Sequence, residues 1–434
     1  MSLLYDFAIG AYASAIKIAS VFNPKAKLWV DGRIGLIEKI KFTIPSDAHP
    51  IWVHCASLGE FEQGRPVIEA IKKAFPEKKI LLTFFSPSGY EIRKKYSGAD
   101  YIFYLPSDTP SNAKAFVEAI NPAIAVFVKY EFWNNYYSEL YQKEIPLYII
   151  SAIFRESQPF FQWYGGFWRN MLQKANHIFV QDEHSLSLLH SAGIKKASIA
   201  GDTRFDRVAE TAIKAERIEE VEHFCSGSKI LVAGSTWPAD EQIIISLIKP
   251  SGTNFKFIIA PHEVDKIHLG QLENLLKGLE WVYYSDLIKG KGKDSKILVI
   301  NNIGMLSRLY QYGNIAYIGG GFGKGIHNIL EAAAFGLPII FGPNYLKFKE
   351  ARDLISKGGA FSINDEAGAA GIFKNLINMP EKATKAGAIS KSYVMDNVGA
   401  TGMILKMIKI RWGEIKSPNK LGLFIFILLF ALSV

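Results

Sequence analysis

The stretch Ile315–Gly342, IAYIGGGFGKGIHNILEAAAFGLPIIFG, decides the fold. It begins with a short apolar run, Ile315–Ile318, and continues into Gly319–Gly325, where five of seven residues are glycine. A segment of helical composition, His327–Phe335, follows, and Gly336 separates it from a second apolar run. This order predicts strand, glycine-rich turn, helix and strand, the repeating unit of an α/β protein with a parallel sheet.

The glycine-rich turn has the properties of a phosphate site. Glycines let a bulky ligand approach the backbone, and a helix that begins just after them offers free N–H groups and a partial positive charge. Glu331, in the first helical turn, could bind ribose hydroxyls. Alternatively, Asn328 and Glu331 form only a capping box.

The same alternation extends through most of the chain. Helical patterns such as Gly64–Phe75 separate the apolar runs, so we expect two parallel sheets with helices on both faces. The charged segment Glu210–Glu222 is expected to be a solvated linker helix. The runs expected as strands are Ile51–Ala56, Ile80–Phe84, Tyr101–Tyr104, Ile124–Val128, Leu147–Ser151, Ile178–Gln181, Ser198–Ala200, Lys229–Gly234, Lys256–Ala260, Trp281–Tyr284, Ile297–Ile300, Ile315–Ile318, Leu337–Phe341 and Ala360–Ile363.

Composition narrows the class of protein. The 434 residues suffice for two domains, and a 49% hydrophobic content with 21% charge is typical of a folded chain. Two cysteines exclude a disulfide framework and a four-cysteine zinc site. The net charge of +9 is dispersed, which favours a membrane surface or an anionic substrate over nucleic acid.

Both ends of the chain are apolar. Leu3–Phe22 is a run of 20 residues interrupted by Asp6 and Lys17. It could span a bilayer, lie at its surface or pack as a first helix on the domain. Leu421–Val434, with 14 residues, is shorter than the about 20 that a spanning helix needs.

Unusual polar residues follow many of the expected strands, where ligands of open α/β sheets bind. Glu60 lies beside Gly59 and could act as a general base, or it forms a capping box with Ser57. Glu131 lies near Trp133, a combination typical of sugar sites, or it is a helix-terminal acid.

Arg204 could balance a phosphate or pair with a neighbouring aspartate. His54 lies within an apolar strand and is expected to be a core residue, whereas His262 follows a strand and is a ligand candidate. There is no G-x-x-x-x-G-K-[ST] loop, no D-x-D pair and no metal-binding histidine spacing, so no metal site is expected.

Several motifs of the chain resemble those of a known family, the bacterial 3-deoxy-D-manno-octulosonic acid (Kdo) transferases that act on lipid IVA. The resemblance covers about residues 1–410. The segments that carry it are Leu28–Gly35 (LWVDGRIG), His54–Glu60 (HCASLGE), Leu105–Pro110 (LPSDTP), Glu131–Asn134 (EFWN), Gly201–Asp206 (GDTRFD), Gly234–Thr236 (GST), Ile326–Ala332 (IHNILEA) and Phe341–Pro343 (FGP).

The resemblance implies a GT-B fold, in which two Rossmann-like domains face a central cleft, with a membrane-associated N-terminal helix. It implies an inverting, metal-independent transfer of Kdo from CMP-Kdo to the lipid A precursor, without a cofactor, at the cytoplasmic face of the inner membrane. The implied domains are residues 1–24 (membrane helix), 25–209 (acceptor domain), 210–410 (nucleotide-sugar domain) and 411–434 (apolar tail).

The resemblance also assigns the site residues. Glu60 matches the general base, Glu131 a second acid of the catalytic site, and Arg204 the cation that stabilises the transition state. The nucleotide contacts fall on Pro261, His262, Ile303, Gly304, Met305, Asn328, Ile329, Leu330 and Glu331.

The chain departs from the family pattern at several positions. Lys129 stands where an acid is common, Glu263 ends a run that lacks the family's arginine, and Met305 replaces an acid. Two other functions remain open: a nucleotide-sugar isomerase of the same fold, and a membrane-docked protein that only binds a nucleotide-sugar.

Overall fold

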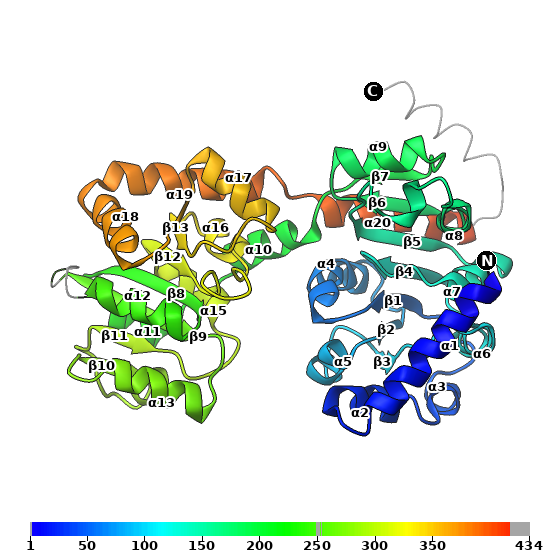
Figure 1. Ribbon diagram of the computed structural model, residues 1–434, viewed down its shortest axis with the longest axis horizontal. Helices are drawn as coiled ribbons and strands as arrows, with labels where there is room; N and C mark the ends of the chain where they lie inside the picture. Colours follow the sequence, from blue (N-terminus) through cyan, green and yellow to red (C-terminus); the bar gives the residue numbers. More distant parts are fainter. Residues whose placement is uncertain (1, 249–251, 253, 417–434) are drawn as a thin grey trace. The chain divides into compact units, whose positions relative to one another are not determined.

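The computed structural model describes residues 2–248, 252 and 254–416. The chain forms two compact units, each described below by itself (Figure 1). Unit 1 comprises Met1–Arg204 with Gly399–Val434, and unit 2 comprises Phe205–Val398.

Unit 1 is built on a seven-stranded parallel sheet of order β3-β2-β1-β4-β5-β6-β7. Its central strands are fully buried because helices cover both faces. The strand order reverses between β1 and β4, which creates a topological switch point. The strands are β1 (Ile51–Cys55), β2 (Ile80–Phe84), β3 (Tyr101–Tyr104), β4 (Ile124–Val128), β5 (Leu147–Ala152), β6 (His177–Val180) and β7 (Ala197–Ile199).

The helices of unit 1 connect these strands and extend to both ends of the chain. They are α1 (Ser2–Ala19), α2 (Pro24–Asp31), α3 (Leu36–Thr43), α4 (Leu58–Ala74), α5 (Pro87–Arg93), α6 (Pro110–Ile120), α7 (Asn134–Gln142), the 3₁₀ helix η1 (Pro159–Phe161), α8 (Gly166–Gln173), α9 (Glu183–Ser191) and α20 (Ala400–Lys416).

Unit 2 repeats the architecture with the strand order β10-β11-β9-β8-β12-β13-β14, and its switch point lies between β8 and β12. The strands are β8 (Lys229–Thr236), β9 (Phe255–Pro261), β10 (Trp281–Tyr283), β11 (Ile297–Val299), β12 (Ile315–Ile318), β13 (Ile339–Phe341) and β14 (Ala360–Ser362). The helices are α10 (Thr203–Ile213), α11 (Glu219–Cys225), α12 (Pro238–Ile248), α13 (Lys266–Leu275), α14 (Tyr284–Leu287), α15 (Leu306–Leu309), the 3₁₀ helix η3 (Tyr310–Tyr312), α16 (Leu330–Ala334), α17 (Lys349–Lys357), α18 (Glu366–Asn378) and α19 (Pro380–Met395).

All fourteen expected strands are present, with ends that differ by no more than two residues. The helix expected at His327–Phe335 is shorter, because α16 begins only at Leu330. Asn328 explains the late start, since its side-chain oxygen accepts the Leu330 N–H and holds the preceding residues in a turn.

The segment Glu210–Glu222 is not the solvated linker that its charge suggests. Val221 and Phe224 of α11 are buried in the core of unit 2, together with Ile218. Their spacing of three residues gives α11 an apolar stripe, which a count of its charged residues does not reveal. The compact units therefore divide after Arg204, whereas the expected division lies between 209 and 210.

Residues 399–416 also differ from the expected domain plan, which places residues up to 410 in the nucleotide-sugar domain, because they belong to unit 1. Helix α20 packs against α4, and Ile404 and Ile408 are buried in the same core cluster as the apolar residues of β1. The apolar stretch Leu421–Val434 lies outside the described residues.

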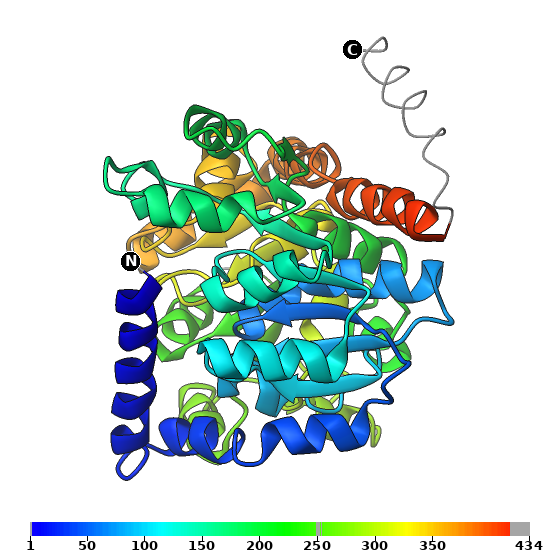
Figure 2. The ribbon, with the colours of Figure 1, turned by 90° about the vertical axis from the view of Figure 1, so that its right-hand side faces the viewer.

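Helix α1 lies along the outside of unit 1 (Figure 2) and has no buried residue. Its amino end is nevertheless anchored. The Tyr5 hydroxyl donates to Asp108 Oδ2 at 2.6 Å, and Asn135 Nδ2 donates to Asp6 Oδ1 at 2.8 Å. In the described part of the chain, no helix combines the length and the apolar character needed to cross a bilayer. Membrane association of α1 therefore stays a prediction.

We predict that Tyr5→Phe loosens α1, because a hydrogen bond to a charged group contributes about 1.5–3 kcal/mol. Amide exchange in α1, followed by mass spectrometry, should accelerate about tenfold or more. Tyr12→Phe is the matched control, since Tyr12 packs its ring on Phe85 and Phe retains that contact. Equal exchange in the two variants would contradict the anchor.

Asp108 predicts an unusual pH dependence. Burial raises the pKa of this carboxyl from 3.8 to about 6. Between these values the folded protein binds the proton more readily than the unfolded chain, so the free energy of unfolding falls as pH rises, by at most about 3 kcal/mol. Urea unfolding from pH 4 to 7 should show this decline in the wild type and a weaker one in Asp108→Asn. Parallel pH profiles would show that Asp108 is not its source.

Candidate active site

The two acids expected at the catalytic site lie at the same edge of the unit 1 sheet. Glu60 follows β1 in the first turn of α4, and Glu131 follows β4, the strand paired with β1. Both lie near the thiol at the end of β1: burial raises the pKa of Cys55 well above 9.0, and the charges of Glu60 and Glu131 raise it further. The structure thus brings together two residues that are 71 positions apart in the sequence.

Glu60 is positioned by its own turn. The Ser57 hydroxyl donates to the Glu60 carboxylate and makes no capping bond to the helix backbone, so a complete capping box is not formed. A side chain at Gly59 would meet only Ser57 Oγ, at 3.7 Å. Gly59 therefore leaves space beside its own backbone, and the adjacent Glu60 is half-buried.

Glu131 is only 9% exposed and is held by two ring N–H groups. Its Oε2 lies 2.9 Å from His54 Nε2 and accepts the Trp133 Nε1–H at 2.8 Å. His54 is fully buried, as expected for a core residue, but its contact with Glu131 was not predicted. The available signal was a histidine near the carboxyl end of an otherwise apolar strand.

Arg204 forms the ion pair that the sequence left open as an alternative. Its Nε and Nη2 lie 2.8 and 2.7 Å from Asp202 Oδ2, and its backbone N–H donates to Asp202 Oδ1. Gln63 of α4 also donates to Asp202, at 3.3 Å. The start of α10, which carries Arg204, is thereby tied to the helix that carries Glu60.

In unit 2 the glycine-rich turn follows β12 at the switch point. A side chain at Gly321 would come within 2.6 Å of the Gly342 backbone, and one at Gly319 within 2.2 Å of the Ser235 carbonyl oxygen. These glycines are required by close backbone packing as well as by any ligand. Asp240 Oδ2 accepts the Gly320 N–H at 2.8 Å and fixes the turn against α12.

Three aromatic rings gather beside this turn. His262 stacks on His327 with ring centroids 4.2 Å apart, and Trp237 lies 5.0 Å from His262. The Trp237 indole N–H donates to His327 Nε2 at 3.0 Å. Burial lowers the pKa of both histidines, that of His327 to about 4, so both rings are neutral at pH 7. His262 was expected as a ligand; Trp237 and His327 were not.

The segment Asn328–Glu331 presents two polar side chains and two apolar ones. Asn328 Nδ2 donates to Glu331 Oε1 at 3.1 Å, whereas Ile329 and Leu330 are buried in the core. A ligand could therefore reach Ile329 and Leu330 only through their backbone. Burial raises the pKa of Glu331, and the charge of Arg207 opposes that rise. Arg207 is thus a further cation near the predicted nucleotide residues, and it was not among the predicted site residues.

Three of the remaining predicted nucleotide contacts line a polar pocket of about 530 Å³. Ile303, Gly304 and Met305 form part of its wall, and Arg217 and Arg308 supply positive charge. Pro261 is the last residue of β9 and His262 follows it, Ile303–Met305 follow β11, and Asn328–Glu331 lie just before α16 or in its first turn.

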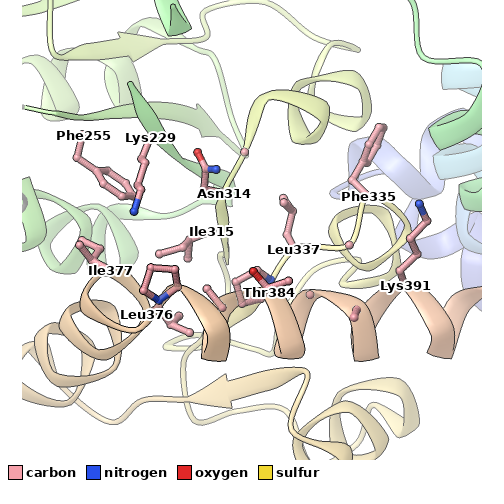
Figure 3. Close-up of a pocket in the computed structure, with 17 residues that line it drawn as sticks. Lys229, Phe255, Asn314, Ile315, Phe335, Leu337, Leu376, Ile377, Thr384 and Lys391 are labelled. Atoms are coloured by element: carbon pink, nitrogen blue, oxygen red, sulfur yellow. The ribbon is translucent and has the colours of Figure 1, made fainter. Parts of the chain in front are cut away.

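A second hollow of about 470 Å³ lies at the opposite, amino-terminal edge of the unit 2 sheet (Figure 3). Lys229 and Asn314 come from the start of β8 and from the residue before β12, and Thr384 and Lys391 come from α19. None of the predicted site residues lines this hollow. Within the described residues, no group of three or more His, Cys, Asp or Glu side chains is placed to bind a metal ion.

Comparison with known proteins agrees with the motifs. Residues 30–207 match the family described as 3-deoxy-D-manno-octulosonic-acid transferase (kdotransferase). The 3-deoxy-D-manno-octulosonic acid transferase of Aquifex aeolicus is 26% identical over 73% of this chain and 82% of its own length, and that of Haemophilus influenzae is 24% identical over 91% and 94%. A bifunctional glycosyltransferase/methyltransferase of Fusobacterium nucleatum is 30% identical over 69% of this chain, which spans about half (48%) of that relative.

Solved structures establish the fold. A UDP-GlcNAc 2-epimerase from Neisseria meningitidis bound to UDP-GlcNAc matches with a TM-score of 0.59 and 17% identity, over 83% of this chain and 99% of its own. A glycosyltransferase from Rickettsia africae matches with a TM-score of 0.53 and 14% identity, over 86% and 100%. Two parallel-sheet α/β units that carry these motifs resemble GT-B glycosyltransferases, and the family match together with the curated relatives supports a Kdo transferase, which is a glycosyltransferase.

Proposed function

We propose that the protein transfers Kdo from CMP-Kdo to the lipid A precursor, with inversion at the sugar carbon and without a metal ion or cofactor. The observation that carries the proposal is the pair of acids, Glu60 and Glu131, at the carboxyl edge of β1 and β4 in a chain that matches the Kdo transferase family over residues 30–207. In an open α/β sheet, ligands bind at the carboxyl ends of the strands, and both acids lie at that edge.

Glu60 is the general base. Its carboxylate takes the proton of an acceptor hydroxyl as that oxygen forms a bond to C2 of Kdo, and the bond from C2 to the phosphate oxygen breaks. CMP leaves with the electron pair of that bond on its phosphate. Attack and departure on opposite faces of C2 give inversion. The space beside Gly59 supports this role, because it leaves room for an incoming hydroxyl next to the half-buried Glu60.

The donor nucleotide binds unit 2 at the glycine-rich turn. The backbone of the turn and the Asn328 and Glu331 side chains supply polar contacts to the nucleotide. The His262 ring supplies a stacking contact. In the absence of a metal, protein cations must stabilise the leaving phosphate. Arg204 is the cation that the family motif assigns to this task, and its ion pair with Asp202 holds the guanidinium in a defined orientation.

Helix α1 attaches the protein to the cytoplasmic face of the inner membrane. Leu3 and Phe7 of α1 are 83% and 74% exposed, and Phe22, just after the helix, is 86% exposed; exposed apolar side chains are unfavourable in water and favourable in a lipid interface. Residues 3–41 contain six Lys or Arg and three Asp or Glu, and this net positive charge is attracted to anionic lipid headgroups. Such a position brings the enzyme to a lipid acceptor.

The nucleotide-sugar isomerase alternative shares the fold, since the matched epimerase has the same two-unit architecture. An isomerase needs no lipid acceptor, however, and leaves the exposed apolar surface of α1 unexplained. A protein that only binds the nucleotide-sugar needs no open space beside an acidic side chain.

The decisive experiment is release of CMP from CMP-Kdo by the purified full chain, with and without lipid A precursor in detergent. We expect release that depends on the acceptor, a product heavier by one or more Kdo units, and an unchanged rate in EDTA. Loss of activity in EDTA would contradict metal independence. Absence of acceptor-dependent release in a folded protein would contradict the transferase itself.

Glu60→Gln should lower the transfer rate about 10²–10⁴-fold, because the amide cannot accept the hydroxyl proton. The fold should survive, since Gln retains the size of Glu and can still accept the Ser57 hydroxyl. Glu69→Gln on the same helix is the matched control, because Glu69 pairs with Arg65 at the surface. A near-normal rate in Glu60→Gln would remove this residue from the mechanism.

Membrane attachment can be tested by flotation with vesicles that contain an anionic phospholipid. Replacing Leu3, Phe7 and Phe22 by Ser should move most of the protein from the vesicle fraction to the soluble fraction. Ile267→Ser with Leu346→Ser is the control, because these side chains are 77% and 69% exposed in unit 2. Equal flotation of the two variants would argue against α1 as the attachment site.

A further inference from the structure

A buried chain of hydrogen bonds lies beneath Glu131. On β1 the Trp52 Nε1–H donates to Thr83 Oγ1 of β2 at 2.8 Å, and His54 Nδ1 lies 2.9 Å from the same oxygen. The other ring nitrogen, His54 Nε2, lies 2.9 Å from Glu131 Oε2. Trp52, His54 and Thr83 are all fully buried, so water does not compete for these bonds.

The donors and acceptors of this chain fix the tautomer of His54. An indole N–H can only donate, so the Thr83 oxygen accepts from Trp52. The hydroxyl hydrogen of Thr83 then needs an acceptor, which His54 Nδ1 provides. The ring proton consequently resides on Nε2 and points at Glu131, whose carboxylate only accepts. All three donors therefore point the same way, from Trp52 toward Glu131.

The carboxylate of Glu131 is held asymmetrically. Its Oε2 accepts both the His54 and the Trp133 ring N–H groups, while the Tyr137 hydroxyl donates to the Glu131 carbonyl oxygen at 2.8 Å and fixes the backbone. Among the described residues, Glu131 Oε1 has no hydrogen-bond partner. Two N–H donors offset the cost of burying the charge, and the second oxygen is left for a ligand.

We propose that His54 is a positioning residue that holds the Glu131 carboxylate through Oε2 and turns its Oε1 toward a sugar hydroxyl of the substrate. This role rests on the proposed Kdo transfer, in which Glu131 belongs to the catalytic site. Thr83 and Trp52 act through His54, because they keep the proton on the nitrogen that faces Glu131. The titratable groups that face Glu131 are His54 and Cys55 on β1 and Tyr137 on α7, with Glu60 of α4 beside the same Cys55 thiol.

The kinetic test compares His54→Leu, His54→Gln and Thr83→Val with the wild type in the Kdo transfer assay. We expect His54→Leu to lower kcat about 10–100-fold, the scale of a small misplacement at a reacting centre, with KM for CMP-Kdo within about threefold. The pH profile of kcat should also differ from that of the wild type, because the variant removes the His54 ring N–H from Glu131. His54→Gln, whose amide N–H can occupy the Nε2 position, should recover most of kcat, and Thr83→Val should fall between.

His177→Leu is the matched control. His177 lies on β6 of the same sheet and bonds Ser198 at 2.8 Å, away from either acid. A kcat and pH profile in His54→Leu equal to those of His177→Leu would overturn the proposal, since a role in stability alone predicts equal effects. So would a failure of His54→Gln to recover activity in a folded protein.

A measurement on the wild type separates this proposal from the proposed function. ¹⁵N chemical shifts of the His54 ring, assigned by comparison with His54→Gln, report which nitrogen carries the proton. We expect the Nε2–H tautomer, and its conversion to a mixture in Thr83→Val. An Nδ1–H ring in the wild type would overturn the proposal whatever the substrate proves to be. Absence of Kdo transfer with an Nε2–H ring would instead refute the proposed function alone.

Discussion

The parallel pairing of β1 with β4 is the constraint on which the unit 1 site depends. Its register sets His54 opposite Phe127, so β4 ends where the next few residues can place Glu131 against the His54 ring. The helix after β1 begins at the same edge and carries Glu60. Because the strand order reverses between β1 and β4, their connections leave on opposite sides and the space between them stays open. A shift of register by one residue would point His54 to the other face of the sheet.

Unit 2 uses a carboxylate for the equivalent task at its own switch point. Asp240 accepts the Gly320 and Trp237 backbone N–H groups and the Tyr317 hydroxyl, and so fastens the glycine-rich turn to the first turn of α12. The turn is thereby a fixed surface rather than a loose loop. Binding energy of a nucleotide need not be spent on ordering it, which favours affinity.

Buried charge is the recurring cost of this design. Glu131 and Asp108 are almost inaccessible: Glu131 accepts two ring N–H groups, and Asp108 accepts two backbone N–H groups and the Tyr5 hydroxyl. Burial still raises the pKa of Asp108 to about 6, so its donors offset the desolvation only in part. The contrast with Glu60 is informative, because Glu60 lies beside an open space and a single serine hydroxyl. Glu131, which is held in place, suits the task of orienting a sugar, whereas Glu60, which is more exposed, suits proton transfer.

The repeating pattern of strands and helices could be predicted from the sequence, because apolar runs of strand length and the turns after them are local properties. All fourteen strands, the placement of polar residues after them and the family motifs follow from that pattern. The tertiary structure decided what local patterns cannot encode. Helix α20 packs in unit 1 because Ile404 and Ile408 are buried in its core. The apolar side of α11 is buried although the helix is rich in glutamate. Helix α16 begins only at Leu330. His54 is the buried core residue that was expected, and strand pairing also makes it the partner of Glu131, with His54 Nε2 2.9 Å from an oxygen of a residue 77 positions away.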